Sequence, residues 1–516
     1  MESDVSVDIS AYNKRGADYA LSGEYQRAIN EFTQAIVLNP LEIFAYYNRA
    51  LVYRTLNEYQ RALADLQHVV ALQPTVAHGY YQRAITYYLL HEHRRALQDF
   101  STVLSLDDQD IPALVGRALV YIAIEEFHQA VINLDHALAL DAQQADQLGA
   151  YGSRGQALSM LKRYDEAIAD FIEALCYRPE DVVMLNRLGA AYTDSGAPEF
   201  SIEHYNKALA LQPLAAYTYN NRGEAYRLLE RYAEAIADFD CALAIDDSLV
   251  TVYYNRGLAY SYLLDYQRAL TDFTHAISLD PSFMPVYHNR ARTCAYLKQY
   301  GEALHDYDTL LGVDPDDREA AYQRGMLYLV LEDPYRALED FNHVIELNPD
   351  DANSYQRRGE TYLRFRDLQQ AKIDCCYSWR LDPAHADHGW LALWIDMCLC
   401  EPINTTPTCL EEVALAEPES YAAYLCRSCA SFLRGSYHDA LRELEYAVIL
   451  DRERWDAYFW RGLIYVCLDQ ISEAVSALEQ AVNLKIPSPL LAPLHWLQRS
   501  HTEFYEHYAL FFLHRA

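Results

Sequence analysis

Positive charge is scarce in this chain of 516 residues. It carries 42 Lys and Arg against 74 Asp and Glu, which gives a formal net charge of −32. Phosphate backbones and anionic lipid surfaces repel such a protein, and no local cluster of Lys or Arg offsets the deficit. The composition therefore argues against nucleic acid and against a membrane as main partners.

Long apolar runs and a leader pattern are also missing. No run of about 18 uncharged apolar residues occurs, and residues 1–8 lack the basic start and apolar stretch of a signal peptide. The 11 cysteines are odd in number and spread along a long chain, unlike those of a small disulfide-stapled domain. We expect a soluble, cytoplasmic protein with reduced and mostly packed thiols.

Catalytic motifs are absent as well. The sequence has no GxSxG, P-loop, GxGxxG or HExxH pattern, and the acidic turns 314–317 and 348–351 lack the Gly and distal Glu of a calcium loop. Cys426 and Cys429 form one CxxC, but no second CxxC or His pair completes a four-ligand zinc site. We predict no catalytic residue, no cofactor and no metal, with a zinc site in the cysteine-rich C-terminal third as the less favoured alternative.

What the sequence does contain is repetition. An arginine recurs every 34 residues and, after a three-residue insertion, the same frame continues with a single Leu: Arg15, Arg49, Arg83, Arg117, Arg154, Leu188, Arg222, Arg256, Arg290, Arg324 and Arg358. Most repeats have Tyr three residues before this framework position, Gly or Ala just after it, Ala thirteen after it and a large apolar residue four further on. A Pro often ends the repeat. This spacing predicts two amphipathic helices per repeat, which bury their apolar faces only by stacking on neighbours.

With these recurring positions the sequence resembles the tetratricopeptide repeat family. The resemblance implies an all-α fold, a right-handed superhelical solenoid of about 13–14 helix-turn-helix repeats. We expect an acidic lead over residues 1–8, eleven well-formed repeats over 9–385, a degenerate repeat over 386–418 and two further repeats over 419–486. A C-terminal helix over 487–516 is expected to cap the array. The alternatives are that it mediates self-association or docks in the groove.

An acidic residue stands sixteen positions after most framework arginines: Glu31, Asp65, Asp99, Asp170, Asp238, Asp272, Asp306, Asp340, Asp374 and Glu443. In the one repeat with Leu188, the acid is also replaced, by His204. We interpret the arginines as structural residues that pair with a carboxylate on the second helix of their own repeat.

In the family the first helix of each repeat lines a concave groove. One residue before the framework position the sequence has a row of amides: Asn48, Gln82, Asn221, Asn255, Asn289 and Gln323. Because an amide both donates and accepts hydrogen bonds, such a row can bind an extended backbone without demanding its sequence. The alternative is that Asn belongs to a stock repeat sequence and faces water.

Neighbouring groove positions are expected to be apolar and aromatic near the N-terminus, with Tyr47, Tyr81 and Tyr88, and more polar further on, with Arg227, Tyr254 and Arg292. Tyr and Arg are enriched at binding hot spots. Alternatively, some of the aromatic side chains pack between repeats.

These residues predict a non-enzymatic scaffold or adaptor that binds a partner polypeptide segment in the groove. The alternatives are a regulatory or sensor subunit of a separate catalytic chain and a self-associating spacer. One known family use, the chaperone carboxylate clamp, is not expected, because of its positions, here Asn13, Ala17, Asn48, His78 and Gln82, only Asn48 matches.

Overall fold

The computed structural model describes residues 2–365, 367–382 and 418–484, together with His501, Phe504 and Ala509. These residues form 27 helices and no strand, which confirms the predicted all-α solenoid class. The chain divides into two compact units, Met1–Leu264 and Asp265–Ala516. The predicted degenerate repeat and C-terminal helix fall outside the described residues, apart from Pro418, His501, Phe504 and Ala509.

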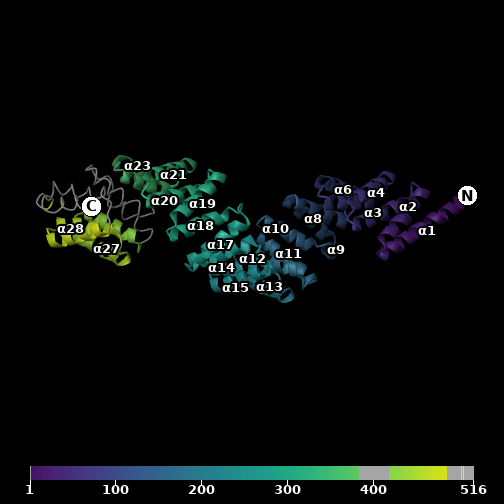
Figure 1. The fold of residues 1–516 in the computed structure, drawn as a ribbon, viewed down its shortest axis with the longest axis horizontal. Helices are drawn as coiled ribbons and strands as arrows, with labels where there is room; N and C mark the ends of the chain where they lie inside the picture. The colour runs from purple at the N-terminus through teal and green to yellow at the C-terminus, as the bar shows by residue number, and fades with distance from the viewer. Residues whose placement is uncertain are drawn as a thin grey trace. The chain divides into compact units, whose positions relative to one another are not determined.

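The helices of the first unit follow one another in antiparallel pairs along the chain (Figure 1). They are α1 (Glu2–Leu21), α2 (Tyr25–Leu38), α3 (Ile43–Thr55), α4 (Tyr59–Leu72), α5 (Ala77–Leu89), α6 (His93–Leu106), α7 (Ile111–Ala123), α8 (Phe127–Leu140), α9 (Ala142–Gln147), α10 (Ala150–Met160), α11 (Tyr164–Tyr177), α12 (Val182–Asp194), α13 (Pro198–Leu211), α14 (Ala216–Leu228), α15 (Tyr232–Ile245) and α16 (Val250–Tyr262).

The second unit continues the same alternation of first and second helices. Its helices are α17 (Tyr266–Leu279), α18 (Pro285–Tyr296), α19 (Tyr300–Val313), α20 (Arg318–Val330), α21 (Pro334–Leu347), α22 (Ala352–Arg364), α23 (Leu368–Leu381), α26 (Tyr421–Leu433), α27 (Tyr437–Leu450), α28 (Trp455–Cys467) and α29 (Ile471–Asn483).

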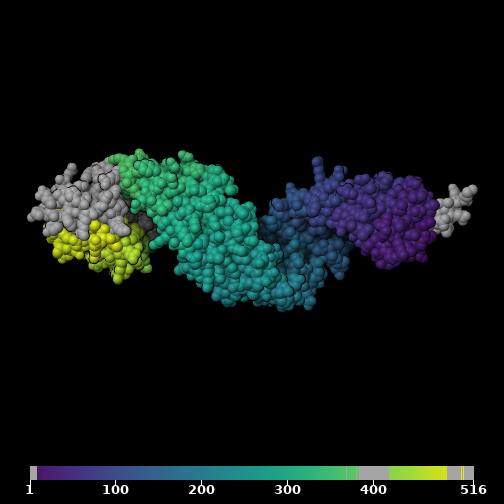
Figure 2. Space-filling view, in the orientation of Figure 1, coloured from purple at the N-terminus to yellow at the C-terminus, as the bar shows by residue number. Residues whose placement is uncertain are grey.

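The small residue after the framework position lets the two helices of a repeat cross closely. A Cβ added at Gly223 on α14 would lie 2.7 Å from Cε1 of Phe239 on α15, closer than two carbons can approach. Phe239 is fully buried at this crossing. Consecutive repeats are also in contact, as α13 is with α14. In the space-filling view the repeats of the first unit lie against one another in chain order (Figure 2).

Wherever the structure describes it, the turn after the first helix of a repeat contains one residue with positive φ, eight positions after the framework residue. It is glycine at Gly23, Gly196 and Gly435, and it carries a side chain at Asn57, His91, Glu125, Lys162, Glu230, Leu264, Lys298, Glu332 and Asp469. The left-handed conformation costs such residues about 1–2 kcal/mol, because Cβ approaches the backbone too closely.

Replacing Glu230 with glycine is therefore expected to stabilise its repeat by about 0.5–1 kcal/mol, since the left-handed turn no longer strains a Cβ. Glu230 is exposed and has φ of 59°. Hydrogen exchange of α14 and α15 measures the change. Glu230→Ala is the matched control, and it should give no gain; a gain in the alanine variant as large as in the glycine variant would refute the explanation.

The three-residue insertion between Arg117 and Arg154 forms an element of its own. Helix α9 (Ala142–Gln147) lies between α8 and α10, and Asp141 caps it by accepting a hydrogen bond from the Gln144 N–H at 3.0 Å. Gly149, with φ of 80°, then starts α10. Because α10 still packs on α8, the insertion lengthens one connection without interrupting the stack.

Nine of the ten predicted arginine–carboxylate pairs are confirmed. In the repeat of α14 and α15, Arg222 donates from Nε and Nη2 to the two carboxylate oxygens of Asp238, at 2.7 and 2.6 Å. The same pairing on one or both oxygens joins Arg15 to Glu31, Arg49 to Asp65, Arg83 to Asp99, Arg154 to Asp170, Arg290 to Asp306, Arg324 to Asp340, Arg358 to Asp374 and Arg427 to Glu443.

Several of these arginines also contact the preceding repeat, which the sequence analysis did not predict. The remaining guanidinium nitrogen of Arg222, Nη1, donates to Asn206 Oδ1 on the preceding repeat at 2.5 Å. Arg49 contacts Thr33 in the same way, and Arg358 contacts Asn342. The guanidinium also lies over the ring of the Tyr three residues earlier, 5.5 Å from the Tyr219 centroid in the case of Arg222. One side chain therefore joins three helices.

Leu188 marks the exception to this arrangement. It is buried, and His204, which replaces the acid, stacks on Tyr192 with ring centroids 5.6 Å apart. Burial lowers the pKa of His204, which favours the neutral ring. The position sixteen residues before the framework residue is Asn206 for Arg222 and Ile172 for Leu188. The arginine, the acid and this polar residue are therefore all replaced together.

Candidate partner-binding face

The predicted site residues lie on the first helices of their repeats. We call the surface formed by the positions one and two before the framework residue, and two and five after it, the first-helix face. Within the first unit successive first helices contact each other, as α12 does with α14 and α14 with α16. Side chains of neighbouring repeats therefore meet on this face.

At the N-terminal end of the face, α3 and α5 bring aromatic and polar groups together. Nη1 of Arg54 donates to Gln82 Oε1 at 2.6 Å, and the hydroxyl of Tyr47 hydrogen bonds with Nε2 of His78. Burial raises the pKa of both Tyr47 and Tyr81, and the nearby Arg54 opposes the rise in each case. Three of the predicted residues, Tyr47, Tyr81 and Gln82, are thus assembled around a residue that was not predicted.

Arg54 changes the description of this segment. The sequence analysis expected an apolar and aromatic surface here, but the face contains a partly buried cation. A sequence signal was present, because Arg54 stands five residues after Arg49, in the same register in which Arg227 was selected five after Arg222.

Further along the first unit, α14 and α16 are linked by amides. Asn255 donates from Nδ2 to Asn220 Oδ1 at 3.2 Å, and Asn220 donates to Asn221 Oδ1 at 3.3 Å. Predicted residues Asn221 and Asn255 are therefore connected through Asn220. All three are partly exposed.

The same part of the face holds Arg227, which is neutralised within its own helix. Its Nε and Nη2 donate to the two carboxylate oxygens of Glu224 at 2.8 and 2.6 Å, and its guanidinium lies 5.9 Å from the centroid of the Tyr262 ring. The hydrogen bonds with Glu224 raise the pKa of Arg227, and Tyr254 contributes in the same direction. Predicted residues Arg227 and Tyr254 are thus close neighbours.

In the second unit the predicted residues bond locally. Asn289 donates to the Pro285 carbonyl at 3.1 Å and accepts from Arg292 at 2.8 Å, both within α18. Gln323 donates to Glu319 at 2.9 Å within α20. His288 of α18 contacts the N-cap residue of α20, where its Nε2 lies 2.9 Å from Asp317 Oδ2.

Two predicted residues join none of these clusters. Asn48 donates to the Phe44 carbonyl of its own helix at 2.8 Å, and Tyr88 lies against His93, the first residue of α6, with ring centroids 6.1 Å apart. Every amide of the row has an intramolecular hydrogen bond. Since an Asn or Gln side chain has two donor hydrogens and a carbonyl with two lone pairs, one bond leaves capacity for a ligand.

An acidic pocket of about 580 Å³ lies beside this face in the second unit. Two of its carboxylates already accept hydrogen bonds from the backbone. Asp317 accepts from the Ala320 N–H at 3.0 Å, and Asp314 accepts from the Asp316 N–H at 3.1 Å. These are helix-capping and turn interactions.

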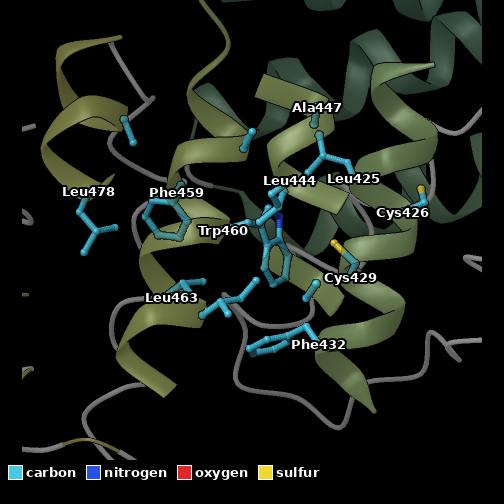
Figure 3. Packing of buried hydrophobic residues seen from close by; sticks show 14 of the residues in the cluster. Leu425, Cys426, Cys429, Phe432, Leu444, Ala447, Phe459, Trp460, Leu463 and Leu478 are labelled. Atoms are coloured by element: carbon cyan, nitrogen blue, oxygen red, sulfur yellow. The ribbon is translucent and has the colours of Figure 1, made fainter. Parts of the chain in front are cut away.

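The last two described repeats differ from the rest at the register of the amide row. Cys426 and Trp460 occupy the position one before the framework arginine, and Leu425 and Phe459 the position two before it, all with 0% exposure. Figure 3 shows Trp460 packed among Cys429, Phe432 and Leu444. Phe504 and Ala509 are buried in the same cluster. The first-helix face is therefore core in these repeats.

Burial also determines the state of the cysteines in this cluster. Cys426 and Cys429 are fully buried, and burial raises the pKa of the Cys429 thiol well above its usual value. A thiol that stays protonated is a poor zinc ligand. Cys398, Cys400 and Cys409 lie outside the described residues, so the absence of a metal from the cysteine-rich third stays a prediction.

Models of one known protein family match the chain along its repeats. Models described as tetratricopeptide repeat match residues 14–77, 288–352 and 433–489, residues 180–248 and 214–282, residues 148–181, and residues 341–373. Together these segments cover more than half of the chain. The chain belongs to the tetratricopeptide repeat family. Tetratricopeptide repeats support a general role as a scaffold for protein–protein interaction.

Several solved structures are similar to this tetratricopeptide repeat protein. A repeat protein from Parabacteroides merdae is 20% identical over 49% of this chain and 98% of its own, with a TM-score of 0.39. YrrB, described as a TPR protein with an unusual peptide-binding site, is 23% identical over 37% and 96%, with a TM-score of 0.31. A chain of the APC/C Cut9–Hcn1 hetero-tetramer is 15% identical over 94% and 95%, with a TM-score of 0.39. The comparison with curated proteins found no match.

None of the helices that the structure describes is both long enough and apolar enough to cross a bilayer.

Proposed function

We propose that the protein is a non-enzymatic adaptor that holds an extended segment of a partner polypeptide on the first-helix face of its first unit. The amides of that face supply hydrogen bonds to the partner's backbone, and the tyrosines supply contact area for its side chains. The negative net charge disfavours nucleic acid as the ligand.

The observation that carries the proposal is the contrast in burial at one register. In the first unit the positions one and two before the framework residue hold partly exposed groups such as Asn221, Asn255 and Tyr254. In the last two described repeats the same positions are apolar and have 0% exposure. An exposed face with polar and aromatic groups can bind a ligand, whereas in the last two described repeats the same positions belong to the hydrophobic core.

The free thiols support a location inside the cell for this adaptor. No cysteine that the structure describes takes part in a disulfide, and Cys176 and Cys241 are exposed. A reducing compartment keeps such thiols free. We therefore place the adaptor in the cytoplasm.

Site-specific cross-linking in the native host tests the proposal. Benzoylphenylalanine replaces Tyr81 or Tyr254 on the first-helix face in two variants, and Ile132 in a control, which is 59% exposed on the second helix α8. We expect one and the same polypeptide to be cross-linked from both tyrosine positions and not from position 132. Equal capture from position 132, or capture from there alone, would place the binding surface elsewhere.

A further inference from the structure

Arg54 is a cation that the fold leaves without a carboxylate. Its one described hydrogen bond is to the neutral amide of Gln82, at 2.6 Å. Its titratable neighbours are the phenols of Tyr47 and Tyr81, which are neutral at physiological pH, and no described Asp or Glu lies within ion-pair distance. Burial lowers the pKa of Arg54, so the guanidinium has lost water contacts without gaining an anion in exchange.

An acidic group near Tyr81 is engaged elsewhere. Asp110 acts on Tyr81, whose pKa it helps to raise after burial, but its carboxylate accepts the Ala113 N–H at 2.9 Å as the cap of α7. The protein therefore offers Arg54 a polar surrounding of phenol and amide groups, and leaves its charge unbalanced.

The chain contains its own comparison for this arrangement. Arg227 occupies the same register in another repeat, and there the position three residues earlier holds Glu224, which binds the guanidinium through both oxygens at 2.8 and 2.6 Å. The corresponding position before Arg54 is Leu51. The two arginines share a place on the face, but only one of them is neutralised by the chain itself.

We propose that Arg54 forms an anion subsite of the first-helix face and binds a single Asp or Glu carboxylate of the partner segment. The inference rests on the proposed function, since the carboxylate arrives as part of the bound polypeptide. The guanidinium can bind the carboxylate through two parallel hydrogen bonds, and the Tyr47 and Tyr81 rings present apolar surface for the flanking residues. A phosphate group is disfavoured because its second charge would be repelled by the net charge of −32.

Peptide display on the full chain tests the subsite. Random peptides that bind the purified protein are selected and sequenced, and the best binder is synthesised with its acidic residue intact and with that residue changed to the matching amide. On the parent protein we expect a fixed acidic position, and about tenfold weaker binding of the amide peptide by fluorescence anisotropy. On Arg54→Gln the two peptides should bind equally, whereas Arg61→Gln, a control at an exposed arginine of the second helix α4, should keep the preference.

Each other result counts against the subsite. Equal binding of the two peptides to the parent protein, or an acid preference that survives in Arg54→Gln, would overturn it while leaving the adaptor function intact. A stronger preference for a phosphorylated residue would overturn the carboxylate assignment. If display yields no peptide that competes at the first-helix face, the proposed function fails and the subsite fails with it. Circular dichroism melting of Arg54→Gln checks that the variant keeps its helices.

Discussion

Replacing Arg222 with leucine is expected to lower the free energy of opening of its repeat by about 3 kcal/mol. The change leaves Asp238, whose side chain is 8% exposed, without its partner, and it breaks the contact to Asn206 on the preceding repeat. Removing one member of a largely buried pair costs more than the pair contributes, because the remaining charge is then uncompensated. Hydrogen exchange of α14 and α15 measures the loss locally, which suits an array in which each repeat contacts only its neighbours.

The repeat of Leu188 suggests two further substitutions that should restore the stability lost in Arg222→Leu. Adding Asp238→His and Asn206→Ile to Arg222→Leu copies the arrangement of Leu188, His204 and Ile172. The new imidazole can stack on Tyr226 as His204 stacks on Tyr192. We expect the triple variant to recover most of the lost stability. If the single variant costs nothing, or if the triple variant is no more stable than the single one, the three positions are not coupled.

The repeat frame and its internal pairs could be predicted from the sequence because they are local and periodic. A spacing of sixteen residues connects the two helices of one repeat, and the change to Leu188 together with His204 showed that the two positions vary together. The small residue at Gly223 and the large one at Phe239 were identified by the same periodicity. Their contact distance then followed from helix geometry.

The contacts between repeats were not predicted. The contact from Arg222 to Asn206 depends on how one helix pair stacks on the next, which the period alone does not specify. Its sequence signal was nevertheless present, since Ile172 stands where the repeats whose arginine makes this contact have a polar residue. The different states of Arg54 and Arg227 likewise depend on the residue three positions earlier, which is Leu51 in one repeat and Glu224 in the other.

The polarity of the face was predicted more accurately than its exposure. The amide row lies on the first helices as expected, but the sequence could not show that Asn220 joins Asn221 to Asn255, because side-chain rotamers decide such contacts. The closed face of the last two repeats was not predicted either. There, Trp460 and Phe459 could equally have lined an open groove, and only the packing shows that they are buried.

The amides of the first unit carry the central claim, that the first-helix face binds a polypeptide. Replacing Asn48, Asn221 and Asn255 with alanine removes three side chains able to bond a ligand backbone. At about 0.5–1.5 kcal/mol for each lost hydrogen bond, we expect Kd to rise by about tenfold to a thousandfold. The helices should keep their stability, because alanine's higher helix propensity offsets the local bonds that are lost.

The decisive measurement is titration calorimetry of the cross-linked partner polypeptide, produced separately, against three proteins. They are the parent, the triple Asn→Ala variant and a control in which Gln26, Gln60 and Gln129, exposed on the second helices α2, α4 and α8, are changed to alanine. The account predicts that the control binds like the parent, and that the Asn variant binds at least about tenfold more weakly with an unchanged circular dichroism melting curve. Equal affinity for all three proteins would contradict it.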